Sequence, residues 1–169
     1  MTTAVNARVS DAWLLPILRE LLPEQALQSL ESKADASYWQ TAVDEALLTD
    51  DDILSAISAR ARVGIASDLL VSSEARDKVS ERLARRFAIL PLSVSESALE
   101  IATSNPYDLD CEKTLAFAAS RAVRMSLASP ARIQERIEEV YAPVERLNRM
   151  IGRTEASRIQ PVVERADAT

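Results

Sequence analysis

Apolar side chains recur at helical spacing through the first third of the chain. Between residues 11 and 22, leucine and isoleucine fall three and four positions apart, as they do on one side of an α-helix. Pro16 lacks the backbone N–H that a helix interior requires, so the regular helix is expected to begin close to it. The same pattern and the capping residues predict four helices before residue 63, which begin near Pro16, Pro23, Ser37 and Thr49. The acidic run at 50–52 is interpreted as the first turn of the fourth helix, where carboxylates meet the positive end of the helix dipole, rather than as a metal site.

The pattern changes after residue 72. Val79, Leu83 and Phe87 are four residues apart and predict one helix capped by Ser72 or Ser73. Short apolar or alternating runs then predict three strands, at residues 89–94, 98–103 and 122–127. A helix capped by Asp108 separates the last two strands, and Ser129-Pro130 begins a final helix.

These elements predict an α+β fold class. An N-terminal helical subdomain is followed by a small helix–strand–strand–helix–strand–helix subdomain with a three-stranded antiparallel sheet. The expected organisation along the chain is a flexible N-terminus at 1–10, the helical subdomain at 11–63, the α+β subdomain at 64–142, a terminal helix at 143–152 and a linker or disordered tail at 153–169.

The composition excludes several kinds of active site. The 169 residues contain no histidine, two glycines and one cysteine, with a net charge of −6. Without histidine there is no Ser-His-Asp triad, Cys-His pair or histidine–metal site, and neither glycine has the neighbours of a phosphate-binding loop. We therefore predict no catalytic residues, no cofactor, no metal and no intrachain disulfide, and we interpret Cys111 as a core residue. The absence of a strong basic surplus argues against nucleic-acid binding.

The sequence contains one possible carboxylate pair for catalysis and one candidate binding surface. Glu100 with Asp108 or Asp110 could act as a carboxylate pair, although nothing in the sequence places such a pair across a cleft. The more promising feature is an apolar helix stripe that either covers the domain's own core or docks onto a partner; it consists of Leu14, Leu15, Leu18, Leu21 and Leu22. No apolar run approaches the roughly 20 residues of a membrane span, and the N-terminus lacks the pattern of a secretory signal.

Four segments resemble one known family in their order and spacing. Residues 85–92 read as a helix end followed by a strand with an aliphatic-Pro-aliphatic motif, and residues 99–106 as a strand that leads into an Asn-Pro turn. Residues 132–141 resemble a closing helix with an isoleucine pair and a terminal tyrosine, and residues 48–54 a capped helix start. Together they resemble the N-terminal domain of the ATPases that drive type II secretion and type IV pilus assembly, the general secretory pathway protein E N-terminal domain family.

The resemblance implies a non-catalytic docking or regulatory module. In this family the N-terminal region holds the motor against the cytoplasmic domain of an inner-membrane platform protein. The expected partners are therefore that platform domain and a C-terminal ATPase domain of the same polypeptide. The expected location is cytoplasmic and peripheral to the inner membrane. The module lacks Walker motifs, although a full-length protein could be an ATPase.

The resemblance also raises an alternative, a cyclic di-GMP sensor of the same fold. The family's ligand pattern has an Arg-Leu-Gly start, a later glycine and a terminal glutamine. Aligned through Thr49, the corresponding positions are Ser37, Tyr38, Trp39, Ala46 and Arg60. The arginine, both glycines and the glutamine are replaced, and a tryptophan blocks close backbone approach to a phosphate or purine. The sequence therefore argues against cyclic di-GMP binding.

Overall fold

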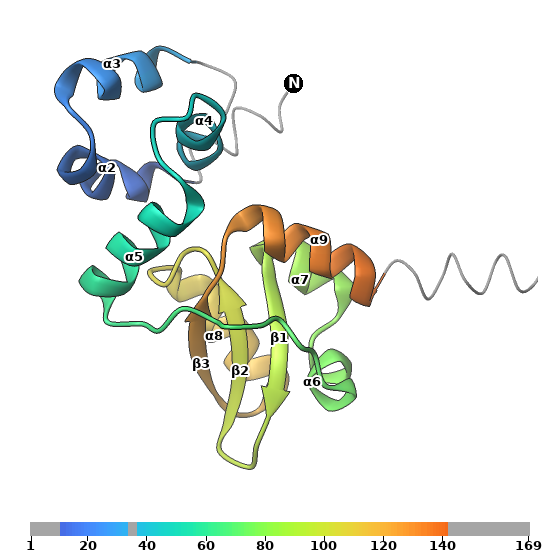
Figure 1. The fold of residues 1–169 in the computed structure, drawn as a ribbon. Helices are drawn as coiled ribbons and strands as arrows, with labels where there is room; N and C mark the ends of the chain where they lie inside the picture. Colours follow the sequence, from blue (N-terminus) through green and yellow to red (C-terminus); the bar gives the residue numbers. More distant parts are fainter. Residues whose placement is uncertain (1–10, 34–36, 142–169) are drawn as a thin grey trace, which may run out of the picture. The chain divides into compact units, whose positions relative to one another are not determined.

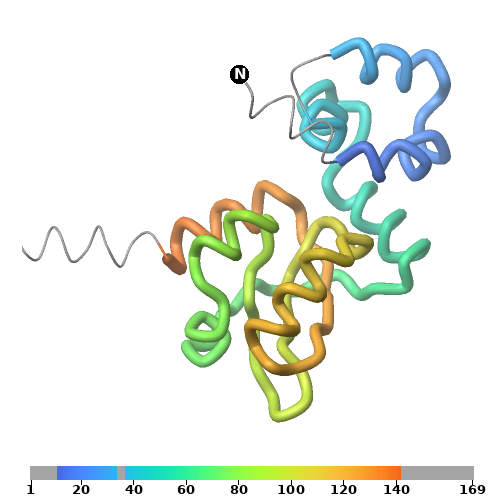
Figure 2. Tube along the Cα trace, turned by 180° about the vertical axis from the view of Figure 1, so that it is seen from behind, coloured from blue at the N-terminus to red at the C-terminus, as the bar shows by residue number. Residues whose placement is uncertain are grey.

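The protein was analysed as a computed structural model, which describes residues 11–33 and 37–141. Two compact units divide the chain, one up to Ile65 and one from Ala66 onward. Figures 1 and 2 show the two units from opposite sides. The predicted N-terminus at 1–10, terminal helix at 143–152 and tail at 153–169 lie outside the described residues.

The first unit is helical, as predicted. It contains a short 3₁₀ helix η1 (Ala12–Leu14) and the α-helices α2 (Leu15–Leu21), α3 (Glu24–Ser32), α4 (Tyr38–Asp44) and α5 (Asp50–Ala61). Pro16 lies in the first turn of α2, where its missing N–H costs no helical hydrogen bond. Ser37 caps α4 by accepting a hydrogen bond from the Gln40 backbone N–H at 2.9 Å. These signals confirm the four predicted helix starts.

The second unit contains three strands and four helices among its described residues. The elements are α6 (Ser73–Lys78), α7 (Glu81–Phe87), β1 (Ile89–Val94), β2 (Ala98–Thr103), α8 (Leu109–Ala119), β3 (Ala122–Leu127) and α9 (Pro130–Val140). Helix α8 covers one face of the sheet, while α6, α7 and α9 pack along β1 (Figures 1 and 2). The buried core lies between these layers and includes Leu99, Ile101, Leu115, Ile133 and Ile137. The α+β fold class is confirmed.

The prediction of a fully antiparallel sheet is wrong for the third strand. The strand order is β1-β2-β3, and β1 pairs antiparallel with β2 as a hairpin. Strand β3 pairs parallel with β2, so that Leu99 lies beside Val123 and Thr103 beside Leu127. The reason is α8, which carries the chain back across the sheet and returns it in its original direction. Pro91 lies in an edge strand at a register irregularity, as its missing N–H predicts.

The single helix predicted after Ser72 is also wrong. The segment forms two short helices, because Val79 is extended (φ −124°, ψ 115°) and Ser80 begins a new helix. The Ser80 hydroxyl accepts a hydrogen bond from the Leu83 N–H at 3.2 Å, which stabilises this second start. The four-residue spacing of apolar residues continues through the break, which is why periodicity alone does not reveal it.

Candidate functional site

The five leucines of the predicted docking stripe divide into core and surface positions. Leu14 and Leu18 are fully buried in the helical unit, and Leu15 and Leu22 are half-buried. Leu21 is 37% exposed. Within the stripe, apolar surface therefore reaches solvent at Leu21 and in part at Leu15 and Leu22, and docking through the whole stripe stays a proposal.

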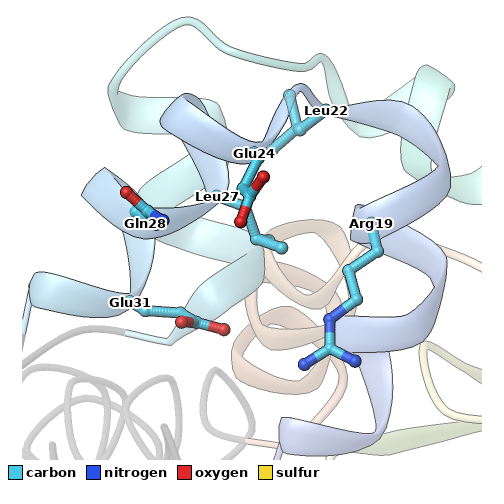
Figure 3. A pocket seen from close by; sticks show the side chains of 6 residues that line it. All are labelled: Arg19, Leu22, Glu24, Leu27, Gln28 and Glu31. Carbon is cyan, nitrogen blue, oxygen red and sulfur yellow. The ribbon is translucent and has the colours of Figure 1, made fainter.

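A hollow of about 380 Å³ opens between α2 and α3 (Figure 3). Its apolar part comes from Leu22 and Leu27. Arg19 lies on one side of the opening and Gln28 and Glu31 on the other (Figure 3). Arg19 has no ion pair with any residue that the structure describes. This hollow adjoins the exposed end of the leucine stripe and combines an apolar floor with charged side chains, a composition suited to a protein partner.

The corner between α4 and α5 is filled by Trp39. This side chain is only 2% exposed, and its indole Nε1–H donates a hydrogen bond to Asp50 Oδ1 at 2.7 Å. The Trp39 backbone N–H donates to Asp11 Oδ2 at 3.1 Å. Burial raises the pKa of the Asp11 carboxyl, and hydrogen bonds such as that from Trp39 partly oppose the rise. Trp39 therefore links α4 to Asp11, the residue before η1, and to Asp50, the first residue of α5. Its role is structural.

The other positions aligned with the cyclic di-GMP pattern have structural partners of their own. Ser37 caps α4, and Arg60 pairs with Glu20 at 3.1 Å. Tyr38 is half-buried in the first turn of α4. Ala46 has a positive φ of 56°, a backbone conformation that favours glycine. Ala46 thus has a glycine-like backbone at the position where the pattern expects glycine, whereas the side chains at the other aligned positions differ from the pattern.

The acidic run at the start of α5 forms a helix cap. Thr49 Oγ1 accepts from the Asp52 N–H at 3.1 Å, and Asp52 Oδ2 accepts from the Thr49 N–H at 3.0 Å. These two backbone bonds lower the pKa of the Asp52 carboxyl. The predicted cap at Thr49 is therefore confirmed. Within 11–33 and 37–141, no group of three or more acidic or cysteine side chains could hold a metal ion.

The carboxylates of the enzymatic alternative each have a separate structural partner. Glu100 accepts a hydrogen bond from the Ser93 hydroxyl at 3.1 Å on the sheet surface. Asp108 caps α8 by accepting from the Cys111 N–H at 3.0 Å, and Asp110 lies 3.6 Å from Arg86. Nothing in this arrangement resembles an acid–base pair across a cleft.

Comparison with known proteins gives a family match for the second unit. Residues 65–147 match the MshEN domain family, so this segment is similar to MshEN domains. The match covers the α+β unit with its hairpin, its parallel third strand and its closing helix, where three of the four resembling motifs lie.

The solved structures with a similar fold extend over more of the chain. A structure of MshE with cdg has a TM-score of 0.60 at 22% identity and covers 76% of this chain and 98% of that chain. The N-terminal domain of XpsE, in one crystal form, has a TM-score of 0.55 at 16% identity and covers 80% of this chain and 94% of its own. No curated protein matches the chain. The resemblance to N-terminal domains of secretion and pilus ATPases is thereby confirmed.

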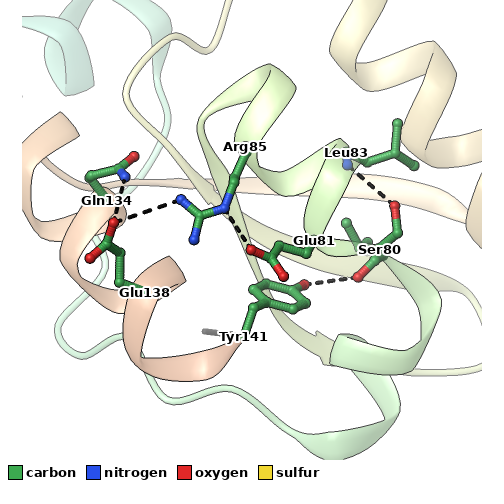
Figure 4. A network of polar contacts seen from close by, with 8 residues as sticks. Ser80, Glu81, Leu83, Arg85, Gln134, Glu138 and Tyr141 are labelled. Carbon is green, nitrogen blue, oxygen red and sulfur yellow. Dashed lines mark hydrogen bonds and ion pairs between the residues drawn. The ribbon is translucent and has the colours of Figure 1, made fainter. Parts of the chain in front are cut away.

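In the α+β unit, polar contacts join the closing helix α9 to α7 and to the break between α6 and α7 (Figure 4). The Tyr141 hydroxyl donates to the Val79 carbonyl oxygen at 2.8 Å, and burial raises the pKa of this phenol to about 12. Arg85 pairs with Glu81 at 2.7 Å and with Glu138 at 3.8 Å, which links α7 to α9. The terminal tyrosine of the motif is therefore an anchor of the fold.

Cys111 lies on the inner side of α8 and is buried, as predicted. Burial, with the charges of the nearby Asp108, Asp110 and Glu112, raises the pKa of its thiol to about 12. A thiol with this pKa is not a nucleophile near neutral pH, so its position indicates packing and not chemistry. None of the described helices has the length and apolar character needed to cross a membrane.

Proposed function

We propose that this chain is a non-catalytic docking and regulatory module of a type II secretion or type IV pilus assembly ATPase. In this proposal it tethers the motor to the cytoplasmic domain of an inner-membrane platform protein. The observation that carries it is the MshEN match over 65–147, together with a fold shared with N-terminal domains of MshE and XpsE. The location would be cytoplasmic and peripheral to the inner membrane through the partner.

The chemistry of the chain supports a binding role over a catalytic one. The sequence has no histidine and no glycine-rich phosphate loop, so an ATPase activity would have to come from another domain of the polypeptide. We expect Walker motifs in the reading frame beyond residue 169. We also expect the purified chain to release no phosphate from ATP, and turnover by this chain alone would contradict the non-catalytic role.

The proposed docking surface is the solvent-exposed end of the leucine stripe with the hollow beside it. Leu21 and Leu22 provide apolar contact area, and Arg19 provides a cation without an ion pair in the described part of the chain. Leu14 and Leu18 support this surface from below, since they are fully buried. Partly exposed apolar residues beside charged ones are typical of the core and rim of a protein interface.

A binding experiment with the platform's cytoplasmic domain tests this surface. Leu21→Asp should weaken binding at least tenfold, because it places a carboxylate in the apolar contact area. Leu70→Asp is the matched control, since Leu70 is 72% exposed but lies in the other unit. Unchanged affinity of a folded Leu21→Asp variant would remove the end of α2 from the interface, and absence of binding by the unaltered chain would contradict the docking function itself.

Cyclic di-GMP sensing is the alternative function. The structure of MshE with cdg and the glycine-like backbone at Ala46 favour it. The buried Trp39 opposes it, because the indole fills the place where a backbone would have to approach the ligand. Calorimetry with cyclic di-GMP is expected to give no binding heat, and a dissociation constant in the micromolar range or tighter would reverse this ranking.

A further inference from the structure

The outer side of α8 carries large apolar side chains that are exposed to solvent. Phe117 is 88% exposed and Leu109 is 64% exposed, whereas Cys111 and Leu115 on the inner side are buried. Lys113 lies midway between the two exposed residues and is itself exposed. We call Leu109, Lys113 and Phe117 the α8 ridge.

The spacing makes the α8 ridge continuous. Residues four apart lie on the same side of a helix, and a rise of about 1.5 Å per residue puts Leu109 and Phe117 roughly 12 Å apart along the axis. Rows of side chains with this spacing are the ridges that pack into the grooves of a second helix. Exposure of phenylalanine and leucine side chains to water is unfavourable, and an exposed apolar surface of this kind is typical of an interaction site.

The charges around the α8 ridge restrict its partner. Lys113 forms no ion pair with any residue in 11–33 or 37–141, whereas the neighbouring Asp110 is already paired with Arg86. The ridge therefore presents a single uncompensated cation between two apolar side chains. A carboxylate on the partner, placed between two apolar residues, would be complementary to it.

The same charges disfavour two other occupants. In a symmetric pair of α8 helices, Lys113 at the centre of the ridge would face Lys113 of the second copy, and like charges repel. A membrane with anionic lipids would meet one lysine beside the carboxylates of Asp110 and Glu112, which is not the basic cluster that such surfaces attract. A heterologous protein helix fits the charges better than either.

We propose that the α8 ridge binds a helix of the platform protein's cytoplasmic domain that carries a carboxylate between two apolar side chains. The inference rests on the proposed docking function, but it places a second contact in the α+β unit, in addition to the α2 surface. Leu109 and Phe117 provide the apolar anchors, and Lys113 selects the register through the partner's carboxylate.

The test measures binding of the full 169-residue chain to the purified cytoplasmic domain of the platform protein by calorimetry. Phe117→Ser should weaken binding at least tenfold, and Lys113→Glu about fivefold or more, with a smaller effect as salt rises. The matched controls are Leu70→Ser, which removes another largely exposed apolar side chain (72%), and Lys78→Glu, which makes the same charge change on α6. Both controls should bind like the unaltered chain. Far-UV circular dichroism checks that all four variants are folded, as their exposed positions predict.

A reversal experiment then identifies the carboxylate. Each acidic residue on the platform domain's helices is changed to lysine, and one such change should restore binding to Lys113→Glu while weakening binding to the unaltered chain. If the unaltered chain binds and the ridge variants bind equally well, the inference is overturned and the docking function stands. If the unaltered chain does not bind the platform domain, both are overturned. If sedimentation of the chain alone shows a dimer that Phe117→Ser dissociates, a second copy is the occupant and the proposed partner is wrong.

Discussion

Leu18 and Leu21 are three residues apart on α2, and truncating each to alanine separates the core of the helical unit from its surface. Leu18 is fully buried, whereas Leu21 is 37% exposed. The change from leucine to alanine removes about three methylene equivalents, or about 2.4 kcal/mol of transfer free energy at full burial. At a packed position the remaining cavity increases the loss, and such substitutions cost about 2–5 kcal/mol.

These terms give different expected costs for the two variants. Leu18→Ala should lower the unfolding free energy of the helical unit by about 3 kcal/mol, since both the transfer and cavity terms apply. Leu21→Ala should cost about 1.5 kcal/mol or less, because only its buried part contributes and solvent can reach the site.

Tryptophan fluorescence provides a selective assay. The chain has two tryptophans, Trp13 and Trp39, and both lie in the helical unit. Their emission during urea unfolding therefore reports this unit, while far-UV circular dichroism reports the whole chain. Leu70→Ala, in the other unit, should leave the fluorescence transition unchanged. Equal costs for Leu18→Ala and Leu21→Ala, or a larger cost for Leu21→Ala, would refute the assignment of Leu18 to the core and return it to the docking surface.

Three further outcomes follow from single side chains. Cys111 should resist alkylation at about pH 8 in the folded chain and react fully in urea, as followed by mass spectrometry, because its thiol is buried with a pKa of about 12. Burial raises the pKa of the Asp11 carboxyl above its ordinary 3.8, so the folded unit binds the carboxyl proton more tightly than the unfolded chain does. The unfolding free energy should therefore fall as pH rises from 3.8 through the raised pKa of Asp11. Asp11→Asn should remove that slope from tryptophan-monitored unfolding, and an unchanged slope would assign it to another group. Tyr141→Phe should lower the stability of the α+β unit by about 1 kcal/mol in urea unfolding followed by circular dichroism, since it removes the hydrogen bond to the Val79 carbonyl. No loss of stability would mean that water replaces this bond.

Local signals in the sequence were sufficient for most of the helices and strands. Ser37, Thr49 and Asp108 each cap the helix that their position predicts, because a side-chain oxygen next to an apolar periodic run leaves few other structures. The strands at 89–94, 98–103 and 122–127 agree with the structure to the residue. Such signals depend only on neighbours along the chain.

Features that depend on tertiary pairing were harder to predict. The direction of β3 is set by α8, and a helix between two strands is itself a sign of a parallel crossover. The short connection between β1 and β2 indicates an antiparallel hairpin, but it does not determine the direction of β3. The break at Ser80 also had a local signal, a serine before a glutamate and an apolar residue, but the uninterrupted apolar spacing outweighed it.

The candidate surfaces show the same limit. Apolar spacing identifies an amphipathic helix but does not say whether its apolar side meets the core or a partner. The leucine stripe was therefore only partly a surface, with Leu14 and Leu18 inside. Conversely, Leu109 and Phe117 are eight residues apart on the side of α8 opposite Cys111 and Leu115, and this second apolar side was the sequence signal for the α8 ridge.

The corner between α4 and α5 bears on the proposal that this chain does not bind cyclic di-GMP. An alanine at φ 56° costs roughly 1–2 kcal/mol relative to glycine, yet Ala46 keeps this conformation. The corner therefore keeps a glycine-like backbone although the residue there is alanine. Trp39 stabilises it by burying its indole and donating to Asp50, which a glycine could not do. A glycine-like backbone at Ala46 can therefore occur together with a large side chain at position 39. Under the proposed function, Trp39 closes the corner to a ligand, and the exposed apolar surfaces of α2 and α8 are the proposed binding surfaces.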